Sequence, residues 1–150
     1  MLNEMDKELS LTKIGYNNSL ALALVKLVKA SLYSEDETVK ESACSSNEHY
    51  KSSLSMNAAE VLLRNSKSEL SKITLCISDK ESRNIVNNTC LALDAIERLN
   101  EDLFTSDRRE DINQLCSDYS FFKNDIDDVI KFLETTVNQL CEENISCSFR

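Results

Sequence analysis

Apolar residues recur at helical spacing along most of the chain, and the pattern is clearest between residues 107 and 141. One apolar residue recurs there every seven positions: Ile112, Tyr119, Ile126, Leu133 and Leu140. Leu115, Phe122 and Val129 fill the intermediate positions that a helix turns toward the same side. Because only one side of the segment is apolar, we expect a long helix that buries that side against other helices.

Two further segments, residues 46–77 and 79–104, carry the same kind of stripe. Their apolar residues are spaced three, four and seven positions apart: Met56, Ala59, Leu63, Leu70, Ile73 and Ile77 in the first, and Ile85, Ala92, Ile96, Leu99 and Leu103 in the second. The first stripe is the more polar one, and Ser66 interrupts it. Both segments are expected to be amphipathic helices.

Capping boxes mark the expected helix starts, because the chain has one glycine, Gly15, and no proline to punctuate it. Four pairs place a serine or aspartate three residues before a glutamate: Ser34–Glu37, Ser45–Glu48, Ser78–Glu81 and Asp107–Glu110. In such a pair the first side chain accepts a hydrogen bond from an otherwise unpaired backbone N–H. The boxes divide the chain into a helix ending near Tyr33, a short segment at 35–43, and long helices at 46–77, 79–104 and 107–141.

The first helix differs from the others because it is apolar around most of its circumference between Leu20 and Val28. A helix of this kind is normally buried on all sides, so we expect it at the centre of the molecule. The alternative is that one flank of this helix is open to a partner's helix or to an apolar ligand.

These elements predict an all-α fold, an up-and-down antiparallel bundle of four main helices plus one short helix. Connections of two or three residues force consecutive helices to run antiparallel, and the apolar first helix is expected to pack centrally. A length of 150 residues with 41% hydrophobic content suits one core. We therefore expect a single domain over residues 1–150, with flexible ends at 1–15 and 142–150.

The composition excludes several classes of site. One glycine cannot build the glycine-rich phosphate loops of nucleotide-binding folds or the tight turns of an all-β fold. A single histidine, His49, disfavours histidine triads, haem sites and multi-histidine metal sites, and we expect its side chain to be solvated or to cap a helix. Short connections leave little room for a catalytic pocket. We expect no enzyme activity, no catalytic residue, no cofactor and no metal.

The net charge of −9 is unevenly distributed. Residues 101–150 carry 12 acidic and 5 basic side chains, a net charge of −7. This charge disfavours binding to nucleic acid or to an anionic membrane surface. The polar start of the chain does not resemble a signal peptide, and the apolar stretch Leu20–Val28 is too short to cross a bilayer. We expect a cytoplasmic protein with no membrane insertion.

The chain contains six cysteines, which invite an alternative: Cys44, Cys76, Cys90, Cys116, Cys141 and Cys147. Helix rise places Cys76, Cys90 and Cys116 too far apart along the bundle for a complete set of disulfides. We therefore expect reduced thiols that behave as small apolar groups. One bridge that pins the C-terminal tail remains open, among Cys76, Cys141 and Cys147, and bonded cysteines would instead indicate a secreted protein.

The candidate partner-binding residues lie on two helices. Phe121 points outward in the register that buries Tyr119 and Phe122, and exposed aromatic residues are favoured interface anchors. Its neighbours on the acidic helix complete one candidate surface: Asp118, Asp125 and Asp128. Leu20 and Leu24 mark the second candidate, an uncovered flank of the first helix.

These observations favour a non-enzymatic module that binds another protein through helix faces, such as a viral or pathogen-delivered adaptor. Two alternatives stay open: a secreted, disulfide-pinned bundle acting as an inhibitor or cytokine-like ligand, and a carrier of a small apolar ligand held between the helices. Association of two copies into a homodimer also remains open.

Overall fold

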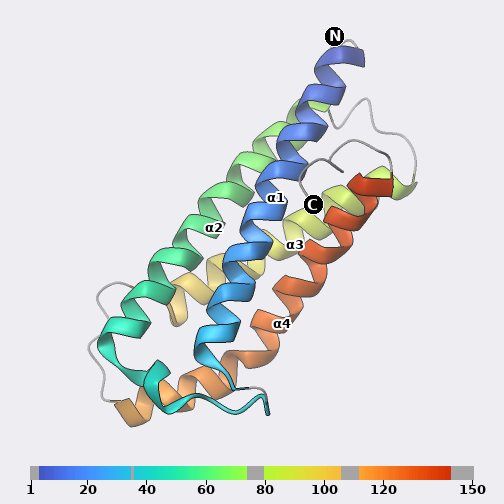
Figure 1. The fold of residues 1–150 in the computed structure, drawn as a ribbon. Coiled ribbons are helices and arrows are strands. Elements are labelled where there is room, and N and C mark those ends of the chain that lie inside the picture. Colours follow the sequence, from blue (N-terminus) through green and yellow to red (C-terminus); the bar gives the residue numbers. More distant parts are fainter. Residues whose placement is uncertain (1–3, 35, 74–79, 106–111, 143–150) are drawn as a thin grey trace.

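The computed structural model describes residues 4–34, 36–73, 80–105 and 112–142, and these residues form a helical bundle (Figure 1). The elements are α1 (Glu4–Leu32), the short 3-10 helix η1 (Glu41–Cys44), α2 (Ser46–Ile73), α3 (Lys80–Asp102) and α4 (Ile112–Glu142). The expected all-α bundle of four main helices plus one short helix is confirmed. The stripes predicted the long helices because the spacing of apolar residues is set within a few turns of helix.

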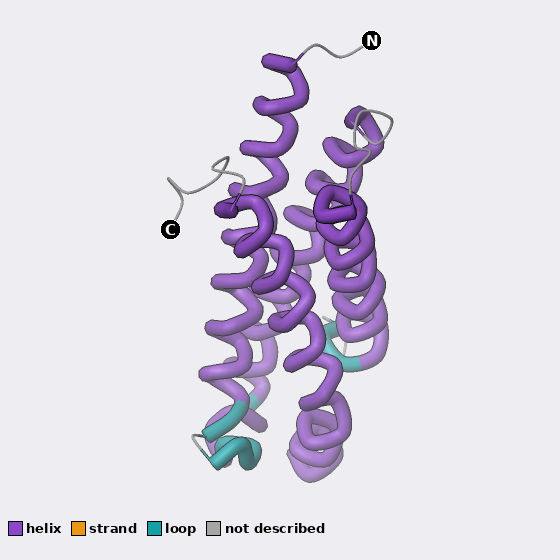
Figure 2. The backbone as a smooth tube through the Cα atoms, turned by 90° about the vertical axis from the view of Figure 1, so that its right-hand side faces the viewer, coloured by secondary structure: helices purple, strands orange, loops and turns teal. Residues whose placement is uncertain are grey.

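The four long helices run alternately up and down, as Figures 1 and 2 show. α1 packs against α2 and α4, and α3 packs against the same two helices, so that α1 and α3 lie diagonally opposite each other. Each helix therefore has two neighbours, and each keeps an outer face that no other helix of the described chain covers.

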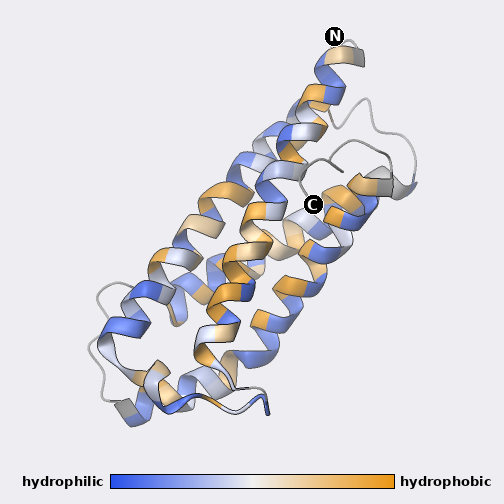
Figure 3. Cartoon of the chain, in the orientation of Figure 1, coloured by the Kyte–Doolittle hydropathy of each residue, from blue (hydrophilic) through white to orange (hydrophobic). Residues whose placement is uncertain are grey.

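The place of α1 corrects the expectation of a helix enclosed on all sides. Ile14, Ala21 and Val25 are fully buried on its inner face, but Leu20 is 38% exposed and Leu27 is 63% exposed. The apolar stretch is visible in the middle of α1 in Figure 3. In a square arrangement of four helices, each helix has only two neighbouring helices. An apolar circumference therefore cannot be covered on all sides.

The N-terminal end also differs from the expected flexible segment at 1–15. α1 begins at Glu4, and Leu11 and Ile14 are buried with 5% and 0% exposure. Residues 143–150, the rest of the other expected end, lie outside the described residues. The start of α1 is held because Leu11 and Ile14 pack into a small apolar cluster with α2, α3 and α4.

The core consists of two apolar clusters with a polar layer between them. The larger cluster occupies the half of the bundle near η1, and the smaller one contains Leu11, Ile14, Leu70, Ile73, Ile85 and Leu140. Between them, Asn18 of α1 donates to the hydroxyls of Thr89 and Thr136 over 3.1 Å each, and Ser66 donates to Asn18 Oδ1 over 2.7 Å. All four side chains are fully buried. Ser66, which interrupts the apolar stripe of α2, thus has a defined role in the core.

The capping boxes have different outcomes. Ser45 Oγ accepts the Glu48 N–H over 3.2 Å at the start of α2, as expected. Ser34 instead closes the loop after α1, where its hydroxyl lies 2.8 Å from that of Thr38. Glu37 takes a left-handed φ of 63° in this loop, a conformation that glycine would adopt at less cost. The boxes at Ser78 and Asp107 lie outside the described residues.

A disulfide joins Cys44 of η1 to Cys116 of α4, with 5.7 Å between their Cα atoms, and corrects the expectation of reduced thiols. Helix rise gives the positions only of cysteines that lie on the long helices. It could not place Cys44, because the connection between α1 and α2 carries η1 against α4. Cys90 is an unpaired, half-buried thiol, and Cys76 and Cys147 lie outside the described residues.

Candidate functional site

Phe121 is the most exposed aromatic side chain of the described chain, with 76% of its surface open to solvent. Position 121 falls outside the α4 stripe that buries Tyr119, Ile126 and Val129. The ring of Phe121 is supported from one side by Phe122, edge to face, with 4.9 Å between the ring centroids and 86° between the planes. Phe122 itself packs against the larger core cluster. This contact holds a large apolar ring at the surface in a defined place.

Three carboxylates surround Phe121 on the same side of α4. Asp118 precedes it by three residues, Asp125 follows by four and Asp128 by seven, which are the spacings of one helix face. Asp125 and Asp128 form no ion pair with any of the described residues, whereas Asp118 accepts a hydrogen bond from Gln114 over 3.0 Å. We call Phe121, Asp118, Asp125 and Asp128 the acidic aromatic face. The structure brings all four together as the sequence predicted.

A shallow recess lies beside this face, between α3 and α4. It has a volume of about 140 Å³ and is lined by Ala95, Arg98, Leu99, Asp102, Phe122 and Asp125. The floor is apolar and the rim is charged, which is the usual arrangement of a protein-binding surface. Asp125 belongs to both features, so the recess and the acidic aromatic face form one continuous surface.

The two residues of the second predicted surface, Leu20 and Leu24, differ in their exposure. Leu20 lies on the outside of α1, but Leu24 is half-buried and packs against the larger core cluster. Sequence reasoning missed three exposed members of the outer side of α1: Met5 at 76%, Leu9 at 54% and Tyr16 at 47%. The signal was present, since these residues continue the spacing of Leu20 and Leu27 on the side opposite the buried stripe.

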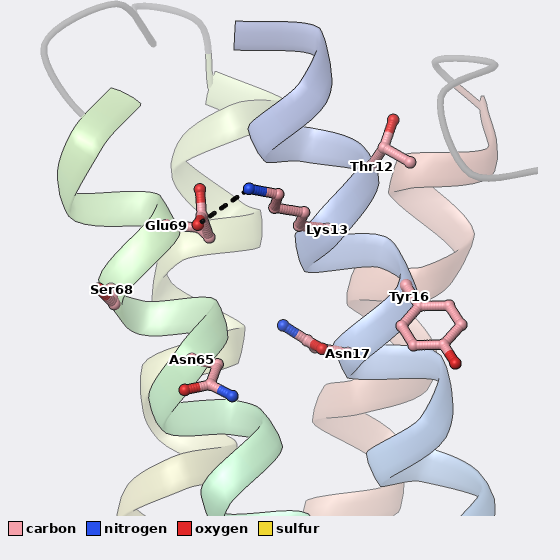
Figure 4. Close-up of a pocket in the computed structure, with 7 residues that line it drawn as sticks. All are labelled: Thr12, Lys13, Tyr16, Asn17, Asn65, Ser68 and Glu69. Carbon is pink, nitrogen blue, oxygen red and sulfur yellow. Dashed lines mark ion pairs between the residues drawn. The ribbon is translucent and has the colours of Figure 1, made fainter. Parts of the chain in front are cut away.

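A polar groove of about 460 Å³ separates the upper parts of α1 and α2 (Figure 4). Its lining consists of Thr12, Lys13, Tyr16, Asn17, Asn65, Ser68 and Glu69. Lys13 and Glu69 approach to 3.8 Å across it. Burial acts to raise the pKa of Glu69, but hydrogen bonds from Ser10 and Lys72 outweigh burial and hold that pKa below its usual value. The charged groups of this groove neutralise one another, so it presents amides and hydroxyls rather than an activated acid or base.

A larger groove of about 920 Å³ lies between the end of α1, the loop after it and α4. Asp127 of α4 holds this region together: it lies 2.8 Å from the ammonium groups of both Lys29 and Lys123. Lys123 also reaches Glu37 of the loop over 3.2 Å. Burial acts to raise the pKa of Asp127, but the two lysines lower it overall. These ion pairs fix the loop and α1 against α4.

His49 is buried, which corrects the expectation of a solvated or capping side chain. It is 6% exposed, its Nδ1 lies 2.5 Å from the Tyr119 hydroxyl, and its ring stacks on Phe104 with 6.0 Å between centroids. The Tyr33 hydroxyl donates to the Tyr119 carbonyl oxygen over 2.5 Å. The spacing in the sequence could have predicted this burial, because His49 lies seven residues before Met56, on the same side of α2 as the buried stripe. His49 therefore has a packing role in the core.

No group of three or more potential metal ligands comes together among the residues that the structure describes. Over the same residues, no helix has the length and apolar character needed to cross a bilayer. No protein-family model, curated protein or solved structure matches the chain at a significant level.

Proposed function

We propose that this protein is a non-enzymatic interaction module that binds a basic partner protein through the acidic aromatic face of α4. The observation that carries the proposal is Phe121, a large apolar ring kept 76% exposed on a helix whose other aromatic residues are buried or half-buried. Leaving such a ring in water is unfavourable, and covering it on binding recovers that free energy.

The charges around Phe121 support a partner of opposite sign. Asp125 and Asp128 form no ion pair with any of the described residues, so both carboxylates can pair with a lysine or arginine of a partner. Exposed charges of one sign mainly raise the association rate and select the partner, while a central aromatic residue contributes most of the affinity. The partner surface that fits is an apolar pocket surrounded by lysine or arginine.

The test compares three purified variants as bait in the protein's native source. Phe121→Ala removes the ring, Asp125→Asn with Asp128→Asn removes the charges, and Tyr50→Ala is the matched control, because Tyr50 is 55% exposed on α2. We expect basic proteins that bind the wild type and Tyr50→Ala, that are lost with Phe121→Ala, and that weaken with the double variant and with added salt. Partners that bind all three variants equally would contradict the proposal.

The second candidate function, a secreted and disulfide-pinned bundle acting as an inhibitor or cytokine-like ligand, is favoured by the Cys44–Cys116 bridge. Disulfides persist in oxidising compartments and are rare in the cytosol. This bond argues against the cytoplasmic location and for a secreted one. Protein from the native source, alkylated under denaturing conditions without reductant, distinguishes the two: six alkylated cysteines would exclude a secreted protein held by this bridge.

No observation favours the carrier of an apolar ligand. The grooves described above are open to solvent and lined largely by polar or charged side chains, whereas a carrier of an apolar ligand needs a largely enclosed apolar cavity.

A further inference from the structure

The outer side of α1 carries an apolar stripe along its whole length. Its large members are Met5, Leu9, Tyr16, Leu20 and Leu27, which are 38–76% exposed. Thr12, Ala23 and Ala30 fill the gaps, so that successive members are three or four residues apart, the spacing of a coiled-coil seam. The stripe is about 38 Å long from Met5 to Ala30 at the rise of an α-helix. The stripe lies opposite the buried side of α1, and its residues do not belong to the core clusters.

The upper end of this stripe extends beyond the rest of the described bundle. In both Figure 1 and Figure 2 the first turns of α1 project past the ends of the other helices. Met5 and Leu9 lie on these turns, and their side chains are 76% and 54% exposed. A projecting helix end with an apolar side is suited to contact a second molecule.

We propose that two copies of this chain associate through the outer side of α1, with the two α1 helices antiparallel. A two-fold interface requires a surface that is complementary to itself, and the positions of the stripe are spaced almost symmetrically about its middle. With the two-fold axis beside residue 18, four pairs form between the copies: Met5 with Ala30, Leu9 with Leu27, Thr12 with Ala23, and Tyr16 with Leu20. Three of these pairs set a larger side chain against a smaller one, so the surfaces can interdigitate.

The charges at the edge of the stripe specify the antiparallel orientation. Glu8 and Lys26 are 18 residues apart, which is five full helical turns, so they lie on the same edge of α1. Neither is in an ion pair with any other described residue. They are also nearly equidistant from residue 18, so the antiparallel arrangement sets each Glu8 against Lys26 of the second copy. In a parallel arrangement these edges of the two copies would lie on opposite sides of the seam, and Glu8 would not meet Lys26 of the second copy.

This interface is separate from the acidic aromatic face, which is on α4. Dimerisation through α1 would leave Phe121 of both copies accessible, and the dimer would present two partner-binding surfaces instead of one. Two linked sites raise the apparent affinity for a partner that also carries two. The inference does not depend on the proposed function, and either can fail alone.

Sedimentation equilibrium of the full chain at a series of concentrations tests the proposal, with circular dichroism to verify that each variant is folded. We expect a wild-type dimer. Glu8→Lys alone and Lys26→Glu alone each place like charges together twice and should weaken the dimer about tenfold. The double variant exchanges the charges and should restore wild-type association.

Two leucine variants test the apolar part of the interface. Leu27→Asp should give a monomer, because it places a charge in the stripe. Leu54→Asp is the matched control, since Leu54 is 56% exposed on α2, outside the stripe, and this variant should remain a dimer. A wild-type chain that is monomeric at 100 μM, on the order of the weakest specific complexes, would overturn the proposal. So would a dimer that Leu27→Asp does not affect or a charge exchange that does not restore association.

Discussion

The hydroxyl of Ser66 donates to the side-chain oxygen of Asn18 over 2.7 Å in the middle of the core, where both side chains are fully buried. Asn18 also donates to Thr89 and Thr136, so one residue from each long helix takes part. Buried polar groups are stable only when they are paired. The layer therefore favours the one vertical alignment of the four helices that pairs them all, a role seen for polar core residues in coiled coils.

Asn18→Ala should destabilise the bundle because it removes the partner of three buried hydroxyls at once. We expect the free energy of unfolding to fall by about 2–3 kcal/mol, measured by urea denaturation followed by circular dichroism. Asn17→Ala is the control, since Asn17 is half-exposed at the polar groove, and it should change stability by less than about 0.5 kcal/mol. Equal effects of the two variants would show that the layer contributes nothing specific.

Reducing the Cys44–Cys116 bridge should lower stability considerably, because it closes a loop of 72 residues. The chain-entropy argument gives about 4 kcal/mol for a loop of this length. The measurement compares urea midpoints of the wild type and of Cys44→Ala with Cys116→Ala, each with and without dithiothreitol. The double variant should be insensitive to the reductant, and Cys90→Ala, which changes an unpaired thiol, should respond to it as the wild type does.

Stability should decrease in acid through the two carboxylates whose pKa values the fold lowers, Asp127 and Glu69. Their folded pKa values lie below those of the unfolded chain, so the stabilisation is present above the ordinary carboxyl pKa of about 4 and is lost as the pH falls below it. Unfolding free energies measured from pH 7 to pH 2 test this. Asp127→Asn should flatten the profile in acid, whereas Asp128→Asn, at an exposed and unpaired site, should leave it unchanged.

Phe121→Ala should leave the melting temperature almost unchanged, because its ring is 76% exposed and contributes little to the core. Phe122→Ala is the matched comparison. Phe122 is half-buried against the larger cluster, and its loss should lower the free energy of unfolding by about 2–3 kcal/mol. Thermal unfolding of both variants by calorimetry makes the measurement. A clear loss of stability with Phe121→Ala would mean that the ring is part of the packing, and the proposed binding surface would lose its anchor.

The two candidate surfaces were predictable from the sequence to different degrees. Phe121 and its aspartates share one face because of helix geometry alone, and the register of Tyr119 and Phe122 sets which face that is. The same reasoning failed for Leu24, which packs against the core although Leu20 is exposed. Which flank of an apolar helix stays open depends on where its neighbours lie, and the pattern of α1 itself does not contain that information.

The sequence by itself determined the four helices, the Ser45 cap and the buried stripe of α4, since these depend on hydrogen bonds and spacings within a few residues. Only the tertiary structure decided the Cys44–Cys116 bridge, the burial of His49 beside Tyr119, and the contact of Asn18 with three other helices. Those contacts join residues 48 to 118 positions apart. They form because the square packing of the helices gives each one two neighbours, and the same packing leaves the outer side of α1 open.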